Sequence, residues 1–357
     1  MQQRVPVELL CVVCAAYVVV GASFVHAQDE PEPLWAYAWS TPPQPGDKAA
    51  PRFAPTRELR PNEDPEEQTR PRNVAGSSAT YSRVDIRDAH NVIDWFPGDH
   101  PPMPDIIKHG PASLAERSRG CGHCHLPNGK GRPENAPTAG QPVGYTIQQL
   151  RDFRDGLRYT VDPRKPNTPV MVALAKAMTE EEMRQSAEYF AAMPWTPWIR
   201  VVETDLIPKM HLEGGNMYIT VGTEPTEPLA GRIVETPEDE HQANVLRNPR
   251  SGWVAYVPVG SLARGENLVT TGGGKTVSCN VCHGPDLMGL GSMPGIAGRS
   301  PSYQMRQLWD MKMGTRKGPQ AALMAPVIAN LTMDDMTDIV AYLASITPQN
   351  PPPTDVQ

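Results

Sequence analysis

Two five-residue segments of the sequence each combine a pair of cysteines with a histidine. Residues 121–125 read Cys-Gly-His-Cys-His, and residues 279–283 read Cys-Asn-Val-Cys-His. This Cys-x-x-Cys-His pattern is typical of the covalent attachment of a c-type haem. Its two thiols can form thioethers with the two vinyl groups of one porphyrin, and the adjoining imidazole can bind the iron. The sequence therefore predicts two haem groups, attached through Cys121, Cys124, Cys279 and Cys282 and ligated by His125 and His283.

Three other uses of paired cysteines fit this pattern less well. A four-cysteine zinc site usually has its pairs about 12 to 20 residues apart, whereas 154 residues (125–278) separate these two pairs. A disulfide inside a Cys-x-x-Cys loop closes a short loop, so it removes little entropy from the unfolded chain. A redox-active dithiol is expected in a thioredoxin-like βαβ context, and neither pair has one. We therefore predict haem attachment at both pairs.

The two segments lie within a longer internal repeat. An offset of 158 positions superimposes both motifs, and it also pairs Pro127 with Pro285, Tyr145 with Tyr303 and Arg158 with Arg316. Beyond a slip of five residues, an offset of 153 pairs Met171 with Met324 and Thr179 with Thr332. Self-similarity of this kind indicates that one structural unit occurs more than once. We therefore predict two copies of one haem-binding module, at residues 105–193 and 262–347.

A methionine is the expected second axial ligand of each iron. Its thioether is a soft ligand that favours ferrous iron and raises the reduction potential, which suits an electron carrier. Met171 and Met324 each lie eight residues before the threonine that begins the last helix of its module. We predict that both ligate iron from a loop that crosses the haem face opposite the histidine. The alternative is that they only fill the core, as methionine usually does.

Other residues of the repeat are expected to support the haem groups. Pro127 and Pro285 each stand two residues after a ligating histidine. A backbone carbonyl there could accept the imidazole Nδ1–H and so fix the ring, although a simple turn proline is the alternative. Four side chains are expected to reach haem propionates through hydroxyl or guanidinium groups: Tyr145, Tyr303, Arg158 and Arg316. An ordinary core or surface role is the other interpretation of these four.

A short helical plan should position these residues in each module. Helices are expected before the cysteine motifs (112–119 and 261–268), after a loop rich in Gly and Pro (145–157 and 303–313), and at the end of each module. The last helices begin with capping-box patterns, Thr179 with Glu182 and Thr332 with Asp335. Apolar residues then recur at helical spacing. We therefore predict a mainly α fold in which small helices surround each haem.

The segments outside the modules have a different composition. The chain has 40 prolines but only five phenylalanines, which indicates much extended or loop structure. Residues 28–104 form a Pro-rich arm, expected to be extended or partly disordered; aromatic residues could hold it onto the modules (Trp35, Tyr37, Trp39, Trp95 and Phe96). Residues 194–261 contain alternating apolar runs at 199–202, 217–221 and 253–259, which predict a small β-containing insert. Residues 348–357 form a Pro-rich tail.

The first 27 residues are predicted to be an export signal. Arg4 precedes an apolar run at 9–22, and Val-His-Ala at 25–27 offers a cleavage site with small residues. The run is short for a membrane span, which needs about 20 residues. An uncleaved membrane anchor is the alternative to a cleaved signal. We therefore expect a periplasmic protein whose mature chain has no membrane span and keeps four cysteines. The formal net charge of −7 argues against a nucleic-acid partner, which needs basic patches.

Taken together, these residues resemble class I cytochromes c, and among them the periplasmic two-haem cytochromes of the c4 type. The resemblance rests on 121–125 with Pro127, 279–283 with Pro285, the segments 145–150 and 303–308, and the segments around Met171 and Met324. It covers about half of the chain. It implies two tandem class I cytochrome c domains that carry single electrons between dehydrogenases or membrane complexes and terminal oxidases or reductases. The arm and the insert depart from the family, so the packing of the modules and the partners stay open.

Three functions compete on this basis. The first is a di-haem electron carrier without chemistry of its own, because two irons ligated by His and Met leave no position for a substrate. The second is the cytochrome subunit of a larger periplasmic dehydrogenase, with the arm and the insert as docking surfaces. The third is an enzyme, such as a di-haem peroxidase or a haem dehydrogenase, which would need an open or displaceable position on one iron. The paired methionines favour the first function, whose expected partners are periplasmic redox proteins.

Overall fold

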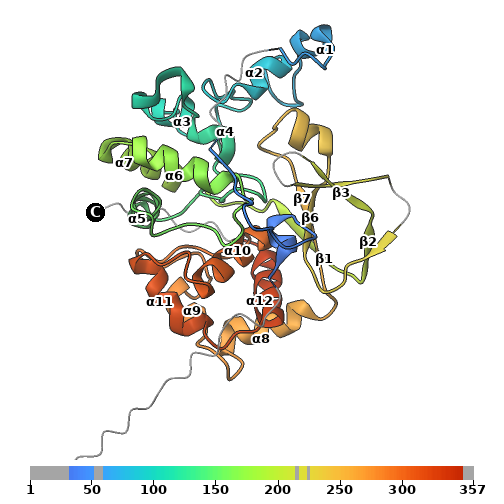
Figure 1. Cartoon of the computed structure of the whole chain (residues 1–357), viewed down its shortest axis with the longest axis vertical. Coiled ribbons are helices and arrows are strands. Elements are labelled where there is room, and N and C mark those ends of the chain that lie inside the picture. Colours follow the sequence, from blue (N-terminus) through green and yellow to red (C-terminus); the bar gives the residue numbers. More distant parts are fainter. Residues whose placement is uncertain (1–31, 52–58, 214–216, 223–225, 349–357) are drawn as a thin grey trace, which may run out of the picture.

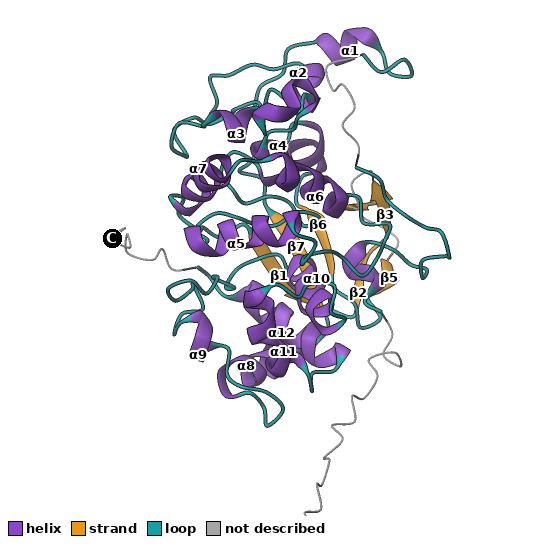
Figure 2. Ribbon diagram, turned by 60° about the vertical axis from the view of Figure 1, so that its left-hand side comes forward, coloured by secondary structure: helices purple, strands orange, loops and turns teal. Residues whose placement is uncertain are grey.

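The computed structural model describes residues 32–51, 59–213, 217–222 and 226–348. The expected export signal (1–27) and almost all of the expected tail (348–357) lie outside these residues. Within them, the chain folds into two helical modules and a β-containing part that lies to one side of both (Figure 1). A view rotated by 60° places the strands behind the helices of both modules (Figure 2).

The first module consists of short helices, drawn in teal and green in Figure 1. They are α3 (Asp105–Lys108), the 3-10 segment η2 (Ala112–Arg117), α4 (Cys121–His125), α5 (Val143–Arg154), α6 (Asn167–Ala177) and α7 (Glu180–Ala191). The expected helix at 112–119 is instead two 3-10 turns, because Ala115 has φ 48° and ψ −139° and breaks the helix. Helix α5 packs against both α6 and α7.

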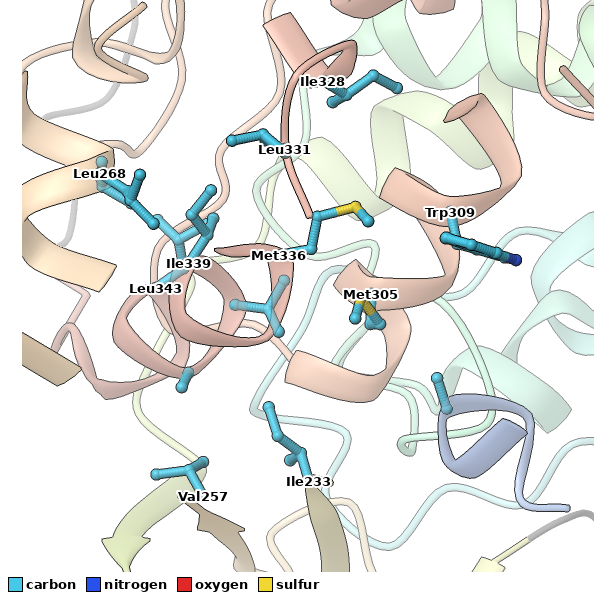
Figure 3. Close-up of a cluster of buried hydrophobic side chains, with 14 of the residues drawn as sticks. Ile233, Val257, Leu268, Met305, Trp309, Ile328, Leu331, Met336, Ile339 and Leu343 are labelled. Carbon is cyan, nitrogen blue, oxygen red and sulfur yellow. The ribbon is translucent and has the colours of Figure 1, made fainter. Parts of the chain in front are cut away.

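The second module repeats this plan in α8 (Ser261–Thr271), α9 (Asn280–His283), α10 (Pro301–Lys312), α11 (Pro319–Ile328) and α12 (Met333–Ser345). Its core lies where α8, α10 and α12 meet, and Figure 3 shows Leu268, Met305, Met336 and Ile339 among the side chains that fill it. Met305 and Met336 are fully buried. Because α8 is a full helix, it covers α12 more completely than the shorter α3 covers α7.

Both predicted capping boxes are present at the start of the last helices. The Thr179 side chain accepts from the backbone N–H of Glu182, and the Glu182 carboxylate accepts from the backbone N–H of Thr179. Thr332 and Asp335 exchange the same two hydrogen bonds at the start of α12. Each box satisfies two backbone donors that a helix leaves without partners at its first turn. The capping patterns therefore mark the beginnings of α7 and α12 correctly.

In its described residues, the part between the modules contains three small sheets. Strand β1 (Ile199–Glu203) pairs in parallel with β7 (Trp253–Val257), which pairs antiparallel with β6 (Val234–Pro237). The other sheets pair β2 (Leu206–Pro208) with β5 (Thr226–Pro228), and β3 (Met210–Glu213) with β4 (Met217–Thr220). The expected strands correspond to β1, β4 and β7, whereas β2, β3, β5 and β6 were not predicted. These four are short and rich in Pro, Glu and Thr, so their alternation is weak.

The described part of the arm is more structured than an extended chain. It contains the 3-10 turn η1 (Leu34–Tyr37) and the helices α1 (Pro65–Thr69) and α2 (Arg83–Arg87). Tyr37 is fully buried in the core of the second module, and the Trp95 indole N–H donates to the Leu246 carbonyl at 2.8 Å. Tyr37 therefore packs the arm against the second module, as predicted, whereas Trp95 contacts the β-containing part and not a module. The expected disorder is wrong for the described residues, because buried aromatic side chains stabilise them.

The two modules contact each other directly through equivalent segments. The Tyr159 N–H donates to the Thr315 carbonyl at 2.9 Å, and the Lys317 N–H donates to the Leu157 carbonyl at 2.8 Å. This pair of bonds places Arg158 opposite Arg316 in an antiparallel bridge. Trp195, two residues after the end of the first module, adds a hydrogen bond from its indole N–H to the Ala297 carbonyl at 2.9 Å. The two modules therefore meet at Arg158 and Arg316, which occupy equivalent positions in the repeat.

Among the residues that the structure describes, no helix has the length and apolar character needed to cross a membrane.

Candidate haem-binding site

The cysteine motifs form the two shortest helices that carry predicted site residues, α4 and α9. Each helix ends directly after its histidine at a residue with positive φ, Leu126 (60°) in the first module and Gly284 (87°) in the second. Glycine adopts this conformation without strain, whereas leucine does so at a cost of about 1 kcal/mol or more. The same turn at equivalent positions lets the chain leave the helix while both sulfurs and the imidazole remain on one side.

Both histidines are held by a backbone carbonyl eleven residues further along the chain. His125 Nδ1 lies 2.8 Å from the Ala136 oxygen, and His283 Nδ1 lies 2.7 Å from the Pro294 oxygen. Because Nδ1 carries the proton that this contact requires, Nε2 keeps its lone pair for a metal. Burial lowers the pKa of both imidazoles, which favours the neutral form that binds iron.

The predicted role of the two prolines is therefore wrong. The carbonyl of Pro127 accepts a hydrogen bond from the Tyr189 hydroxyl at 2.8 Å, and the carbonyl of Pro285 accepts from the Asn280 amide at 2.8 Å. Neither carbonyl contacts a histidine, because the chain turns away after Leu126 and Gly284. The two prolines hold the turn instead, and Ala136 and Pro294 orient the rings.

One continuous cavity connects the two motifs. Its volume is about 1680 Å³, well above the roughly 300–1,000 Å³ of a site for one small ligand. Its lining includes all the predicted attachment and axial residues, Cys121, Cys124, His125 and Met171 together with Cys279, Cys282, His283 and Met324. The lining is mostly apolar, as a porphyrin requires. The cavity thus has room and ligands for two haem groups.

Met171 and Met324 lie in helices and not in the predicted loops. Met171 is in α6 and Met324 is in α11, and both are partly buried on the cavity wall. Pro166, Pro169 and Pro319 stand at the starts of these helices, where proline is tolerated because the first N–H groups have no partners, whereas Pro326 lies inside α11. Helices fix the positions of the two thioethers more firmly than loops would.

The four residues that were predicted to contact haem propionates form a cluster that joins the two modules. Arg158 donates to the Tyr303 hydroxyl at 3.1 Å, and Arg316 donates to the Tyr145 hydroxyl at 3.1 Å. Each arginine thus contacts the tyrosine of the other module. Gln149 and Gln307, which sequence reasoning missed, accept from both arginines. All six side chains line the cavity, so the cluster lies at the boundary of both sites.

Buried cations on the cavity wall retain unused hydrogen-bond donors. Arg132 Nε and Nη1 and Arg316 Nε have no partner among the described atoms, although both side chains are buried. Unsatisfied buried guanidinium donors are costly, and carboxylates are their preferred partners. A ligand with carboxylate groups, such as haem with its propionates, fits this wall. Arg132 could have been suspected from the sequence only with knowledge of the loop that brings it to the first motif.

Two interface residues were also missed by sequence reasoning. Arg299 is buried, and its guanidinium donates to the Pro137 carbonyl at 2.8 Å and to the Ala139 carbonyl at 3.0 Å. Its repeat equivalent, Gln141, donates to the Gly295 carbonyl at 3.0 Å. Because the two positions carry different residue types, comparison of the repeats gave no signal. Arg299 thus holds the loop that contains Ala136, and Gln141 holds the loop that contains Pro294. Each of the two loops is therefore attached to the other module.

The other uses of paired cysteines are not supported by the site. Burial raises the pKa of the Cys121 thiol to about 12 and that of the Cys279 thiol to about 11, whereas a reactive dithiol needs a lowered pKa. The four cysteines of the described chain form no disulfide. No group of three His, Cys, Asp or Glu side chains in the described ranges could hold a metal ion. Haem attachment therefore explains the motifs best.

Comparison with known proteins assigns the family. The family model described as Cytochrome c matches residues 262–347. Cytochrome c-554(548) of Halomonas halodenitrificans is 37% identical over 87 residues, which are 24% of this chain and 96% of that protein. A thiosulfate dehydrogenase electron acceptor of Stutzerimonas stutzeri is 25% identical over 239 residues, covering 66% of this chain and 81% of that protein.

A cytochrome c4 also matches over a long part of the chain. Cytochrome c4 of Pseudomonas aeruginosa is 21% identical over 234 residues, covering 63% of this chain and 83% of that protein. The matched family binds haem, and the chain has two attachment motifs and a cavity large enough for two haem groups. The chain therefore belongs to the cytochrome c family and is a c4-type, electron-transferring cytochrome with two covalently bound haem c groups.

Proposed function

We propose that this protein carries single electrons between periplasmic redox partners through two haem groups that are each ligated by one histidine and one methionine. When bound, haem supplies the one-electron couple of its iron. The chain supplies the covalent anchors, the axial ligands and the walls that exclude other ligands. The observation that carries the proposal is the shared cavity, whose lining contains one Cys-Cys-His-Met set from each module.

The methionine assignment is supported by the repeat and by the cavity together. Five methionines line the cavity: Met171, Met178, Met293, Met311 and Met324. Only Met171 and Met324 stand at equivalent positions, since the counterparts of Met178, Met293 and Met311 are Leu331, Asn135 and Phe153. Two modules that bind the same cofactor in the same way require equivalent ligands. A thioether on each iron also leaves no vacant position, which supports electron transfer without catalysis.

Absorption spectroscopy of the oxidised protein tests this assignment. Methionine bound to ferric haem gives a weak band in the far red. Met171→Ala and Met324→Ala should each remove about half of its intensity, because each replacement leaves one thioether ligand in place. The matched controls Met178→Leu and Met311→Leu should keep the whole band, since both side chains line the same cavity. An intact band in either alanine variant contradicts the ligand assignment.

The second test addresses haem attachment and substrate access. The intact mass of the native protein should exceed that of the polypeptide by two porphyrins, and Cys121→Ser with Cys124→Ser should remove one of them. Cyanide and peroxide should bind slowly to the wild-type protein and rapidly to Met171→Ala. Rapid peroxide turnover by the wild-type protein would favour a peroxidase and overturn the carrier proposal.

A more specific candidate is the electron-accepting subunit of a periplasmic dehydrogenase. The names of two relatives favour it, because the proteins from Stutzerimonas stutzeri and Thiomonas intermedia are both called thiosulfate dehydrogenase electron acceptors and each aligns over about two thirds of this chain. Purification at native levels should then yield a stable complex with a larger catalytic subunit. Elution of the cytochrome alone, at its own mass, argues for the freely diffusing carrier.

A further inference from the structure

The part of the cavity that belongs to the second module is lined by several exposed apolar side chains. Val277, Val281, Leu290 and Leu323 all line the shared cavity, and their exposed fractions are 54%, 71%, 58% and 60%. They account for four of the nine large apolar side chains that are exposed in the described chain. Cys282, one of the predicted haem anchors, is also exposed there. We call these four residues the apolar rim.

Three of the four rim residues, Val277, Val281 and Leu323, lie in segments that have no charged residue. Residues 276–284 and 318–333 contain no Asp, Glu, Lys or Arg. The two segments are joined, because the Thr276 hydroxyl donates to the Val327 carbonyl at 2.5 Å. Helix α11 buries only Ala321 and Ile328 and exposes Ala322, Leu323 and Ala325. In a chain of net charge −7, an exposed, uncharged helix beside a cofactor site indicates an interaction surface.

The equivalent face of the first module is covered by the chain itself. The counterparts of the rim residues are Arg119, His123, Arg132 and Val170, so three of four positions are basic or polar. Arg247, from the β-containing part, donates to the His123 carbonyl, and Asn128 donates to the Pro249 carbonyl at 2.6 Å. The arm completes the cover through Trp95, which donates to Leu246 in the same segment. A partner can therefore reach the second motif more directly than the first.

We propose that redox partners dock on the apolar rim, so that electrons enter or leave through the second haem, while the insert and the arm close the outer face of the first. This inference rests on the proposed electron-carrier function. The partner is an electron-transfer protein whose cofactor is surrounded by uncharged, apolar side chains. A charged group pressed against the rim would lose its hydration without gaining an opposite charge, which is costly.

The size and the position of the rim favour such a partner over a second copy of this chain. Four large side chains form a small footprint, in the range of weak electron-transfer encounters, which bury less than about 1,200 Å² in total. A permanent dimer usually buries about 2,000 Å² or more. A dimer formed through this face would also cover the one motif that the chain leaves open, and the carrier would lose its access to partners.

Charge placed on the rim tests the proposal. The variants are Leu290→Glu and Leu323→Glu, with Leu206→Glu as the matched control, since Leu206 is 55% exposed on β2 and outside the rim. The probe is a blue-copper protein with an uncharged, apolar face at its copper site. A basic cytochrome c with a lysine-rich face serves as the contrasting probe. Stopped-flow absorption measures the second-order rate of electron transfer from the reduced holoprotein.

We expect both rim variants to react at least about tenfold more slowly with the blue-copper probe, and the control to react at the wild-type rate. The wild-type rate should change little with added salt, because salt weakens the attraction between charged surfaces and these two faces have no charge. Unchanged rates in the rim variants, or a wild-type protein that reacts faster with the lysine-rich probe, overturn the docking proposal. So does a wild-type dimer that Leu323→Glu dissociates in sedimentation experiments.

Redox titration separates this inference from the proposed function. If the rim variants still show two reversible one-electron steps but react at wild-type rates, only the docking surface is wrong. If the wild-type protein shows no reversible reduction at its haem groups, the carrier function itself fails. The titration also confirms that both variants are folded and carry both haem groups.

Discussion

Replacement of Tyr37 by phenylalanine tests whether the arm is an integral part of the fold. Tyr37 is fully buried, and its hydroxyl donates to a carboxylate oxygen of Asp310 at 2.8 Å. The same oxygen accepts from the Val161 backbone N–H at 2.9 Å. One buried carboxylate thus connects the arm, the end of the first module and helix α10. Removal of one hydroxyl should destabilise all three together.

The loss should depend on pH, because burial raises the pKa of Asp310 from 3.8 to about 6. At pH 8 the carboxylate is ionised, and a hydrogen bond to a charged group contributes roughly 1.5–3 kcal/mol. At pH 5 the folded protein holds Asp310 mostly neutral, and the bond contributes roughly 0.5–1.5 kcal/mol. Tyr37→Phe should therefore lower the free energy of unfolding by about 1 kcal/mol more at pH 8 than at pH 5.

The wild-type protein should show the matching trend in its own stability. Between the unfolded-state pKa of about 4 and the folded-state pKa of about 6, Asp310 is protonated in the folded protein and ionised in the unfolded chain. The free energy of unfolding should therefore fall as the pH rises from about 4 to 6. The shift of about two units corresponds to at most about 3 kcal/mol. Asp310→Asn should remove this fall, because the amide does not titrate while its oxygen still accepts both hydrogen bonds.

Urea unfolding followed by far-ultraviolet circular dichroism at pH 5 and pH 8 measures both effects. Tyr342→Phe is the matched control, because Tyr342 packs partly buried against the same core and lies on α12, away from the arm. It should lose little stability, and equally at both pH values. An equal loss for Tyr37→Phe at pH 5 and pH 8, or no loss beyond that of the control, would refute the reasoning about the buried carboxylate.

Three further predictions address the caps, the interface and the first haem. Thr332→Ala should lower the free energy of unfolding by about 1 kcal/mol in denaturant titrations, because it removes half of the capping box of α12. Arg158→Lys should weaken the contact between modules, since lysine lacks the fork that reaches Gln149, Tyr303 and Gln307; limited proteolysis should then cleave the chain faster. Arg247→Gln should lower one reduction potential in spectroscopic titration and leave the other unchanged, because the cation lies beside Cys124.

The sequence predicted the parts of the site that depend on local chemistry. The attachment residues follow from covalent spacing, and Thr179 and Thr332 mark helix starts because their hydrogen bonds reach only three residues along the chain. The strands β1 and β7 were visible because their apolar residues alternate or run together. The pairing of Met171 with Met324 required only that the repeat be aligned through a five-residue slip.

The remaining features depend on tertiary structure and gave little local signal. Ala136 and Pro294 orient the histidines through backbone carbonyls, so their side chains show no shared pattern. The helices around Met171 and Met324 were read as loops, because proline lowers helix propensity wherever its position in the turn is unknown. Arg247 reaches the first motif from 124 positions away, across a β-containing part whose fold the sequence indicated only in outline.

The two modules differ most at the outer faces of their sites and least at the ligands. A change in a cysteine, a histidine or a methionine would remove a haem, whereas a change at the rim alters only what can approach it. The first module has polar and basic residues at these positions and is covered by Arg247 and its neighbours, while the second keeps Val277, Val281 and Leu290 exposed. The positive charge of half-buried Arg247 beside the first site favours the ferrous form there, and an uncovered site exchanges electrons with partners more readily. If both effects operate, the first haem holds the electron and the second delivers it. Exchange of the rim residues between the modules, which moves Arg119 and Arg132 from the first site to the second, should then change the partner rates and bring the two potentials closer together.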